Sequence, residues 1–163
     1  MKRTIKQFFK LEPSIPLWRY CILAVPIALI PSAAILFIAS NFYRVVESKI
    51  SSASEISTAL NVLGSVIIAP LLETLLLAGF LKILFRLNSH PLLNATIAAA
   101  LWGTFHGLVE PIWFWGTIWS LFVFSLAFVT WRKISFQHAF LAAAIPHSLI
   151  NLMANLVLII APQ

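Results

Sequence analysis

The chain has 163 residues, of which 61% are hydrophobic and only 10% charged, with a mean hydropathy of +0.96. Soluble domains contain about 45–50% apolar and about 25% charged residues, so polar groups cannot cover the surface of this chain. This composition excludes a soluble enzyme, a disordered tail and a nucleic-acid-binding domain, and lipid is the expected solvent. The net charge of +6 arises from Lys and Arg at the ends of apolar runs.

The N-terminal stretch KRTIKQFFK (2–10) is basic and contains two phenylalanines, which predicts a short interfacial helix that stops at Pro13. A cleavable signal peptide is the alternative, but the apolar run after Arg19 exceeds the usual length of about 7–15 residues. The single cysteine, Cys21, excludes an internal disulfide and a thiolate metal cluster. Burial as a small hydrophobic residue and palmitoylation near the membrane surface are the two interpretations of Cys21.

About five apolar runs are long enough to cross a membrane, since a spanning helix needs about 20 mainly apolar residues. They cover approximately residues 19–42, 57–85, 91–109, 111–131 and 136–160. The separating segments are short and polar or begin with proline, and no two-residue alternation typical of a barrel is present. The sequence predicts an all-α, polytopic helical membrane protein that forms a single membrane domain over residues 1–163.

The basic residues are distributed among the loops as an odd number of spans requires. Lys and Arg gather before the first run, after the second and after the fourth, whereas the third loop and the C-terminus have none. The positive-inside rule places the N-terminus in the cytoplasm and the C-terminus outside, in a plasma membrane.

Three ionisable residues fall inside the apolar runs, where they are costly and by default mark function. They are Glu73, His106 and His147, and Asn151 lies one helical turn beyond His147. At 1.5 Å per residue, measured from the ends expected in the cytoplasm, Glu73 lies at a depth of about 18 Å and His147 at about 17 Å. His106 and Asn151 lie at about 23 Å. Because one slab about 6 Å thick holds all of them, they are expected to form one site.

Prolines precede two of these residues, at Pro70 and Pro146. A proline inside a helix removes a backbone hydrogen bond and kinks the chain, so both are expected to open space beside the site. Small residues are expected to allow close helix packing, among them Gly64, Gly79, Gly103 and Gly107.

The segments APLLETLLLAGF (69–80), WGTFH (102–106) and HSLIN (147–151) resemble the CAAX protease and bacteriocin-processing membrane family, called CPBP or Abi. That family has a proline-preceded Glu-Glu-x-x-x-Arg motif, then Phe-x-x-x-His, then His-x-x-x-Asn or Asp. The resemblance covers about residues 56–155. Thr74 stands at the second glutamate, Ala78 at the arginine and Trp102 at the aromatic position.

The resemblance implies an intramembrane endopeptidase that depends on a glutamate and cleaves a membrane-associated peptide or protein. Family members cleave prenylated C-terminal peptides, or in bacteria are linked to bacteriocin processing, immunity and peptide maturation. In this hypothesis Glu73 acts as general base on a water that His106 orients. His147 and Asn151 donate hydrogen bonds to the oxyanion.

Three alternatives use the same residues. No cofactor is expected, but Glu73, His106 and His147 suit a zinc or iron site with water at an open position. A non-catalytic immunity or peptide-binding protein is favoured by Thr74 and Ala78, where the charges of the family motif are missing. A proton-coupled transporter would also explain buried Glu and His, although no inverted repeat is evident. Lipid and a membrane-linked peptide are the expected partners, and nucleic acid is not.

Overall fold

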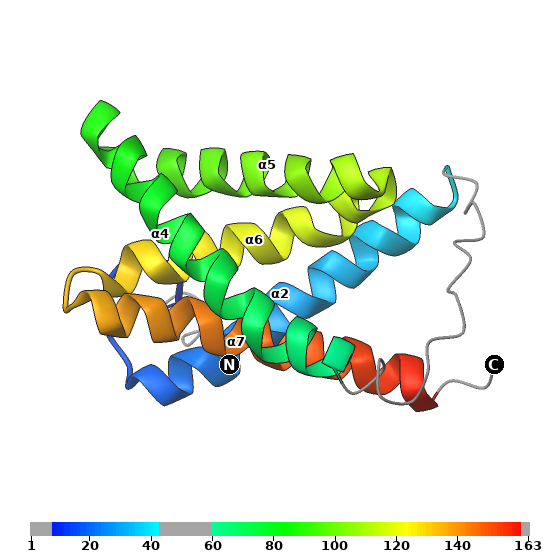
Figure 1. Ribbon diagram of the computed structural model, residues 1–163. Coiled ribbons are helices and arrows are strands. Elements are labelled where there is room, and N and C mark those ends of the chain that lie inside the picture. The colour runs from blue at the N-terminus through cyan, green and yellow to red at the C-terminus, as the bar shows by residue number, and fades with distance from the viewer. Residues whose placement is uncertain (1–7, 43–59, 161–163) are drawn as a thin grey trace.

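The computed structural model describes residues 8–42 and 60–160, and this part of the chain is helical apart from turns (Figure 1). The helices are α2 (Leu17–Ser40), a π-helical turn η1 (Gly64–Ile68) that leads into α4 (Ala69–Leu87), α5 (Pro91–Val109), α6 (Pro111–Trp131) and α7 (Phe136–Ile160). Among the described residues, five helices are long and apolar enough to cross a membrane, with η1 and α4 forming parts of one span, Leu60–Leu87. The prediction of an all-α, multi-pass membrane protein is confirmed. Most of the predicted interfacial helix, residues 2–7, lies outside the described residues.

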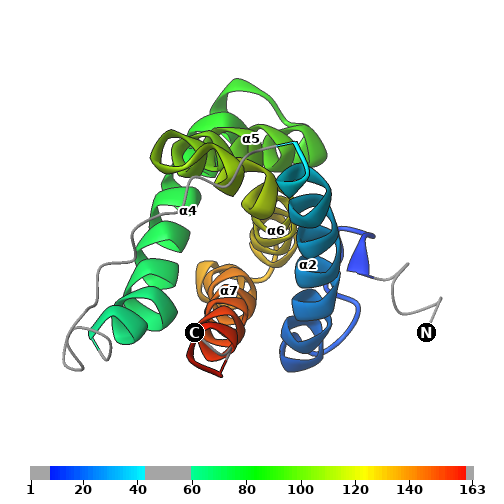
Figure 2. The same ribbon diagram turned by 90° about the vertical axis from the view of Figure 1, so that its right-hand side faces the viewer.

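Helix α6 occupies the middle of the bundle, as the end-on view in Figure 2 shows. It packs against α2, α5 and α7, and its C-terminal half is almost continuously buried from Ser120 to Trp131. Buried alanines on the neighbouring helices leave room for these close contacts; examples are Ala24 and Ala28 on α2, Ala98 on α5 and Ala142 on α7. Large apolar side chains such as Ile30, Phe37 and Leu108 point outward, as expected for a surface solvated by lipid.

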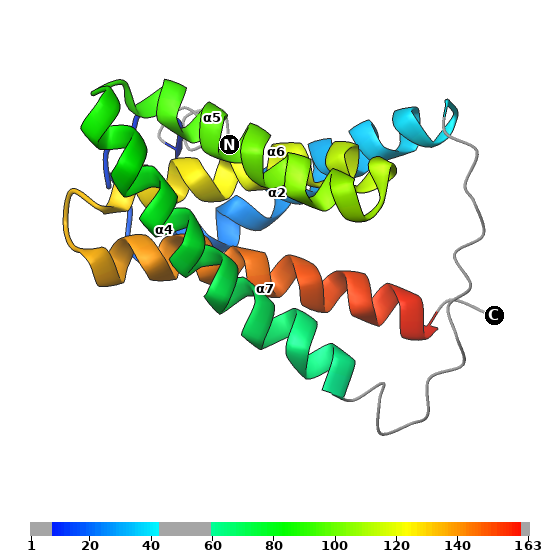
Figure 3. The same cartoon turned by 45° about the horizontal axis from the view of Figure 1, so that its top comes forward.

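Helix α4 packs on α5 and α7 and lies to one side of the bundle (Figure 3). A tight turn joins α4 to α5, because the amide of Asn88 donates to Oδ1 of Asn94 at 2.7 Å and the amide of Asn94 donates back to the carbonyl of Asn88 at 3.3 Å. Asn94 is fully buried, so these bonds satisfy a polar side chain inside the protein. The turn holds the two helices that carry Glu73 and His106 beside each other.

Glycine allows the closest approach between α5 and α6. A Cβ atom added at Gly107 would lie 3.0 Å from Cβ of Phe114, and one at Gly103 would lie 3.2 Å from Cδ1 of Ile118. The expected packing role therefore holds for these two glycines. It is wrong for Gly64 and Gly79, where an added Cβ would meet no atom within 4 Å.

A side chain of α6 compensates for a proline in α2. Pro31 has no N–H, so the carbonyl of Ile27, four residues earlier, has no partner within the helix. The indole Nε1 of Trp119 donates to this carbonyl at 2.8 Å. One turn further, the hydroxyls of Ser32 and Ser120 bond each other at 2.7 Å. The part of α2 around Pro31 is thus tied to α6 by hydrogen bonds that lipid could not supply.

Trp119→Phe is expected to lower the free energy of unfolding by about 1–3 kcal/mol, because it leaves the Ile27 carbonyl without a donor. In a Pro31→Ala background, the new N–H of residue 31 bonds that carbonyl, so the same substitution should cost at least about 0.5 kcal/mol less. Trp119→Phe loses the packing of the indole ring in both backgrounds, so this loss cancels when the two changes in unfolding free energy are compared. Denaturation in mixed micelles measures the four proteins, and strictly additive values would contradict the assignment.

Cys21 lies at the contact between α2 and α7. Its side chain is buried, and its thiol donates to the carbonyl of Leu141 at 3.8 Å. This environment is that of a small buried hydrophobic residue with a weak donor.

Candidate functional site

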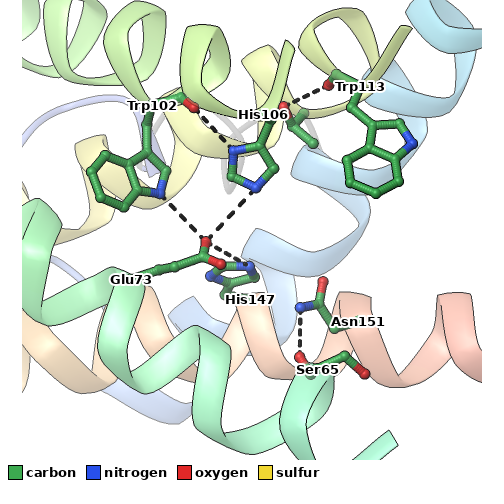
Figure 4. Close-up of polar contacts among 8 residues, drawn as sticks. Ser65, Glu73, Trp102, His106, Trp113, His147 and Asn151 are labelled. Carbon is green, nitrogen blue, oxygen red and sulfur yellow. Dashed lines mark hydrogen bonds and ion pairs between the residues drawn. The ribbon is translucent and has the colours of Figure 1, made fainter. Parts of the chain in front are cut away.

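Three titratable side chains from three helices meet beside α4 (Figure 4). Nε2 of His106 on α5 lies 3.9 Å from Oε2 of Glu73 on α4. Nε2 of His147 on α7 lies 3.8 Å from the same oxygen. The structure therefore brings together the carboxylate and the two imidazoles that the depth argument placed in one slab. We call these three residues the Glu–His–His cluster.

The cluster is only partly shielded by protein. The side chains of Glu73 and His106 are 26% and 25% exposed, whereas that of His147 is 11% exposed. The ring of His147 stacks on Phe124 of α6, with ring centroids 4.8 Å apart and planes 20° apart. Because of this stacking, the orientation of the His147 ring is fixed by the core, while Glu73 and His106 remain partly exposed.

Hydrogen bonding selects the tautomer of His106. Its Nδ1 lies 3.0 Å from the carbonyl of Trp102, one helical turn earlier on α5. A carbonyl oxygen can only accept, so Nδ1 carries the proton, and in the neutral ring Nε2 keeps its lone pair. That lone pair points toward the carboxylate of Glu73 (Figure 4). The distances from Oε2 of Glu73 to Nε2 of His106 and to Nε2 of His147, 3.9 Å and 3.8 Å, are longer than a direct hydrogen bond. They allow one water to contact the carboxylate and an imidazole.

Trp102 is part of the site, although the sequence alone predicted no role for its indole N–H there. Its indole Nε1 donates to Oε2 of Glu73 at 3.4 Å, the oxygen that both histidines approach (Figure 4). The signal was present in the spacing, because Trp102 precedes His106 by four residues and therefore shares its helix face.

The segment that leads into Glu73 along the chain contains Pro70 and a π-helical turn before it. In η1 the N–H of Ala69 donates to the carbonyl of Gly64, five residues back, instead of to that of Ser65. The next possible donor is residue 70, a proline without an N–H. The carbonyl of Ser65 is consequently left without a helical partner.

Asn151 supplies the missing donor from α7. Its amide nitrogen donates to the carbonyl of Ser65 at 2.8 Å. Asn155, one turn later, donates to the hydroxyl of Ser65 at 3.1 Å and to the carbonyl of Asn151 at 2.7 Å. These bonds join η1 to the helix that carries His147. Figure 4 shows the amide of Asn151 turned toward Ser65, apart from the carboxylate of Glu73. The role of Asn151 as an oxyanion donor stays a prediction.

Asn151→Ala tests whether this residue acts through structure. We expect a loss of about 1 kcal/mol in the free energy of unfolding, because the Ser65 carbonyl becomes unpaired in the membrane. Ser65→Ala is the matched control, since it removes only the hydroxyl and keeps the carbonyl that Asn151 binds. Equal destabilisation by both variants would contradict this assignment. A 100- to 1,000-fold fall in kcat at unchanged stability, on the order of an oxyanion donor's effect, would instead support the sequence prediction.

The donor set does not fit a metal ion as it is arranged. Zinc requires nitrogen and oxygen ligands at about 2.0–2.2 Å around one centre. Within residues 8–42 and 60–160, no group of three His, Cys, Asp or Glu side chains could hold a metal ion. Both imidazoles instead approach a single oxygen of Glu73.

Two positions near Glu73 on α4, Thr74 and Ala78, are uncharged and buried. Thr74 is 3% exposed and Ala78 is 8% exposed. In the described part of the chain, the two histidines are the ionisable groups within ion-pair distance of Glu73.

Fold and site together define a multi-pass membrane protein with a carboxylate, two imidazoles and an indole N–H gathered inside its helical bundle. No family model, curated protein or solved structure matches the chain. The functional argument therefore depends on the geometry and chemistry of the site.

Proposed function

We propose that the chain is an intramembrane endopeptidase that depends on Glu73 and cleaves a membrane-associated peptide or protein. The observation that carries this proposal is the approach of His106 and His147, from separate helices, to one carboxylate oxygen of Glu73. Ionisable groups are rarely placed within membrane spans without a functional reason. Their spacing suits one water held between a base and its partners.

In the proposed reaction, Glu73 takes a proton from this water as the oxygen attacks the carbonyl carbon of the peptide bond. The carbonyl oxygen becomes an oxyanion, and the carbon–nitrogen bond then breaks. The proton held by Glu73 passes to the leaving nitrogen, so the products are a carboxyl group and an amine. His106, with its proton on Nδ1, presents Nε2 to the water and orients it.

His147 and Trp102 support the developing charges. Nε2 of His147, if it carries the ring proton, is an N–H donor for the oxyanion, and stacking on Phe124 fixes its direction. The indole N–H of Trp102 holds the carboxylate of Glu73 in place. Trp102 is thus a positioning residue, because it acts through Glu73.

The membrane location follows the charge distribution. Under the positive-inside rule the N-terminus and the α4–α5 and α6–α7 turns face the cytoplasm, and the C-terminus lies outside a plasma membrane. The cluster then lies within the bilayer, so the substrate is expected to be anchored in the membrane or to insert into it.

A second candidate function is a non-catalytic peptide-binding or immunity protein. It is favoured by the amide of Asn151, which bonds Ser65, and by the buried, uncharged Thr74 and Ala78. Under this alternative, the cluster would bind a peptide carbonyl or amide without breaking it.

Reconstitution separates the two candidates. The native protein is placed in vesicles with fluorescently labelled, membrane-anchored peptides, and the products are identified by mass spectrometry. Cleavage that requires Glu73 supports the endopeptidase. Saturable peptide binding without cleavage, unchanged in Glu73→Gln, supports the second candidate. Cleavage that is lost with a chelator and restored by zinc would support the metal-dependent form.

A further inference from the structure

A hollow beside α4 lies away from the Glu–His–His cluster, at the end of the bundle that carries the α4–α5 and α6–α7 turns; both turns lie on the left in Figure 1. It is a groove of about 490 Å³ between α4, the end of α6 and the start of α7. We call it the basic groove. Its lining residues are Leu75, Ala78, Gly79, Leu81, Lys82, Phe85, Arg86, Phe128, Arg132 and Phe136. None of them belongs to the Glu–His–His cluster.

The basic groove has two chemically distinct parts. Lys82, Arg86 and Arg132 contribute three cations, and no acid is among its lining residues. Within the described ranges none of the three forms an ion pair with a carboxylate. Phenylalanine and leucine side chains supply the walls, so the groove is basic at one end of the helices and apolar toward the middle of the bilayer.

The spacing of the lining residues gives the groove its direction. Arg86 lies 11 positions after Leu75 on α4, so the lining stripe spans a rise of about 16 Å. It therefore runs from the membrane boundary into the hydrocarbon region. The guanidinium of Arg132 lies over the ring of Phe85, 3.6 Å from its centroid, which holds this cation above the apolar wall.

We propose that the basic groove binds one anionic phospholipid, with its phosphate among Lys82, Arg86 and Arg132 and an acyl chain along the walls. Charge complementarity supports this occupant, because a zwitterionic lipid brings a cation of its own to the rim. The positive-inside rule explains why cations gather at this end of the bundle. It does not explain why they converge on one apolar groove. Basic pockets between spanning helices are a known mode of anionic headgroup recognition.

Gly79 fits the same interpretation. A Cβ added there would meet no atom within 4 Å, so the space beside Gly79 is open and the residue serves no close helix contact. Glycine is about 1 kcal/mol less favourable than alanine in a helix interior. A larger side chain at this position therefore favours the helix and has room to project into the groove.

Native mass spectrometry of the protein released from detergent tests the proposal. The protein is titrated with phosphatidylglycerol or phosphatidylcholine, and bound lipids are counted. We expect one retained phosphatidylglycerol and at least tenfold weaker phosphatidylcholine binding. Each cation near the phosphate is worth about fivefold in affinity, so the double variant Lys82→Gln/Arg132→Gln should bind phosphatidylglycerol about 25-fold more weakly.

Two further variants control for misfolding and for the change in total charge. Lys133→Gln removes an exposed cation that follows Arg132 but does not line the groove, and it should change binding less than twofold. Gly79→Leu keeps every charge, favours the helix and fills the apolar part, so it should weaken lipid binding about tenfold or more.

The outcomes are distinct. Equal retention of the two lipids, or equal binding by Lys133→Gln and the double variant, would overturn the proposal. Displacement of phosphatidylglycerol by millimolar inorganic phosphate would show an anion site and would also overturn it, because the acyl chain would then contribute nothing. None of these measurements requires proteolytic activity, so the result stands apart from the function proposed for Glu73.

Discussion

Glu73→Gln is expected to slow cleavage of a membrane-anchored peptide by about 100- to 10,000-fold, the usual contribution of a general base. Glutamine keeps the size of the side chain and can still accept the hydrogen bond from the indole of Trp102. It cannot take a proton from water. Single-turnover cleavage in vesicles reports the change in the chemical step. The protein is in excess of the peptide, at a concentration above the dissociation constant of their complex.

Glu110→Gln is the matched control for this experiment. Glu110 is the residue before α6, at an end of the spans, and its side chain makes no capping hydrogen bond. Its neutralisation should leave cleavage within twofold of the native rate. If Glu73→Gln cleaves as fast as Glu110→Gln, Glu73 is not the base. Thermal unfolding of both variants in detergent confirms that folding is retained.

His147→Ala is expected to reduce kcat by about 100- to 1,000-fold, on the order of the loss of one preorganised oxyanion donor. Its imidazole is the most shielded member of the cluster, and stacking on Phe124 fixes the direction in which its ring can donate. Because the interaction forms only with the oxyanion, KM should change little. The measurement is a full kinetic curve with the same anchored peptide.

His138→Gln provides the comparison on the same helix. The ring of His138 bonds the hydroxyl of Ser135 and stacks on Trp131, near the start of α7 and away from Glu73. Its replacement should leave both kcat and KM nearly unchanged. A similar loss of activity in the two histidine variants would point to damage of α7 as a whole. A change confined to KM in His147→Ala would indicate ground-state binding.

Much of the fold was predictable because membrane insertion depends on a local property of the chain. Each run of about 20 apolar residues can satisfy its own backbone only as a helix. The predicted spans agree with the observed helices to within a few residues, for example 111–131 with α6. The approach of Glu73, His106 and His147 to one another was also predictable, since the constant rise per residue places them at similar distances from the helix ends.

Several features of the site were not accessible in this way. The hydrogen bond from Trp102 to Glu73, and the two bonds that turn Asn151 and Asn155 toward Ser65, join residues far apart in the sequence. The π-helical turn before Pro70 creates the free carbonyl that Asn151 binds. No periodicity in the sequence indicates such a turn, because its formation depends on the partner offered by α7.

Hydropathy and rise per residue are properties of one helix at a time, so the amino-acid order alone was enough to predict the apolar helices, their ends and the position of each polar residue along its helix. Which faces meet is a property of pairs of helices. Close contact at Gly103 and Gly107, the open groove beside Gly79 and the direction of each site side chain depend on how the helices rotate and cross. Lipid solvates one apolar helix face almost as well as another. The faces that meet are therefore selected by the shapes that pack together and by the polar groups that pair.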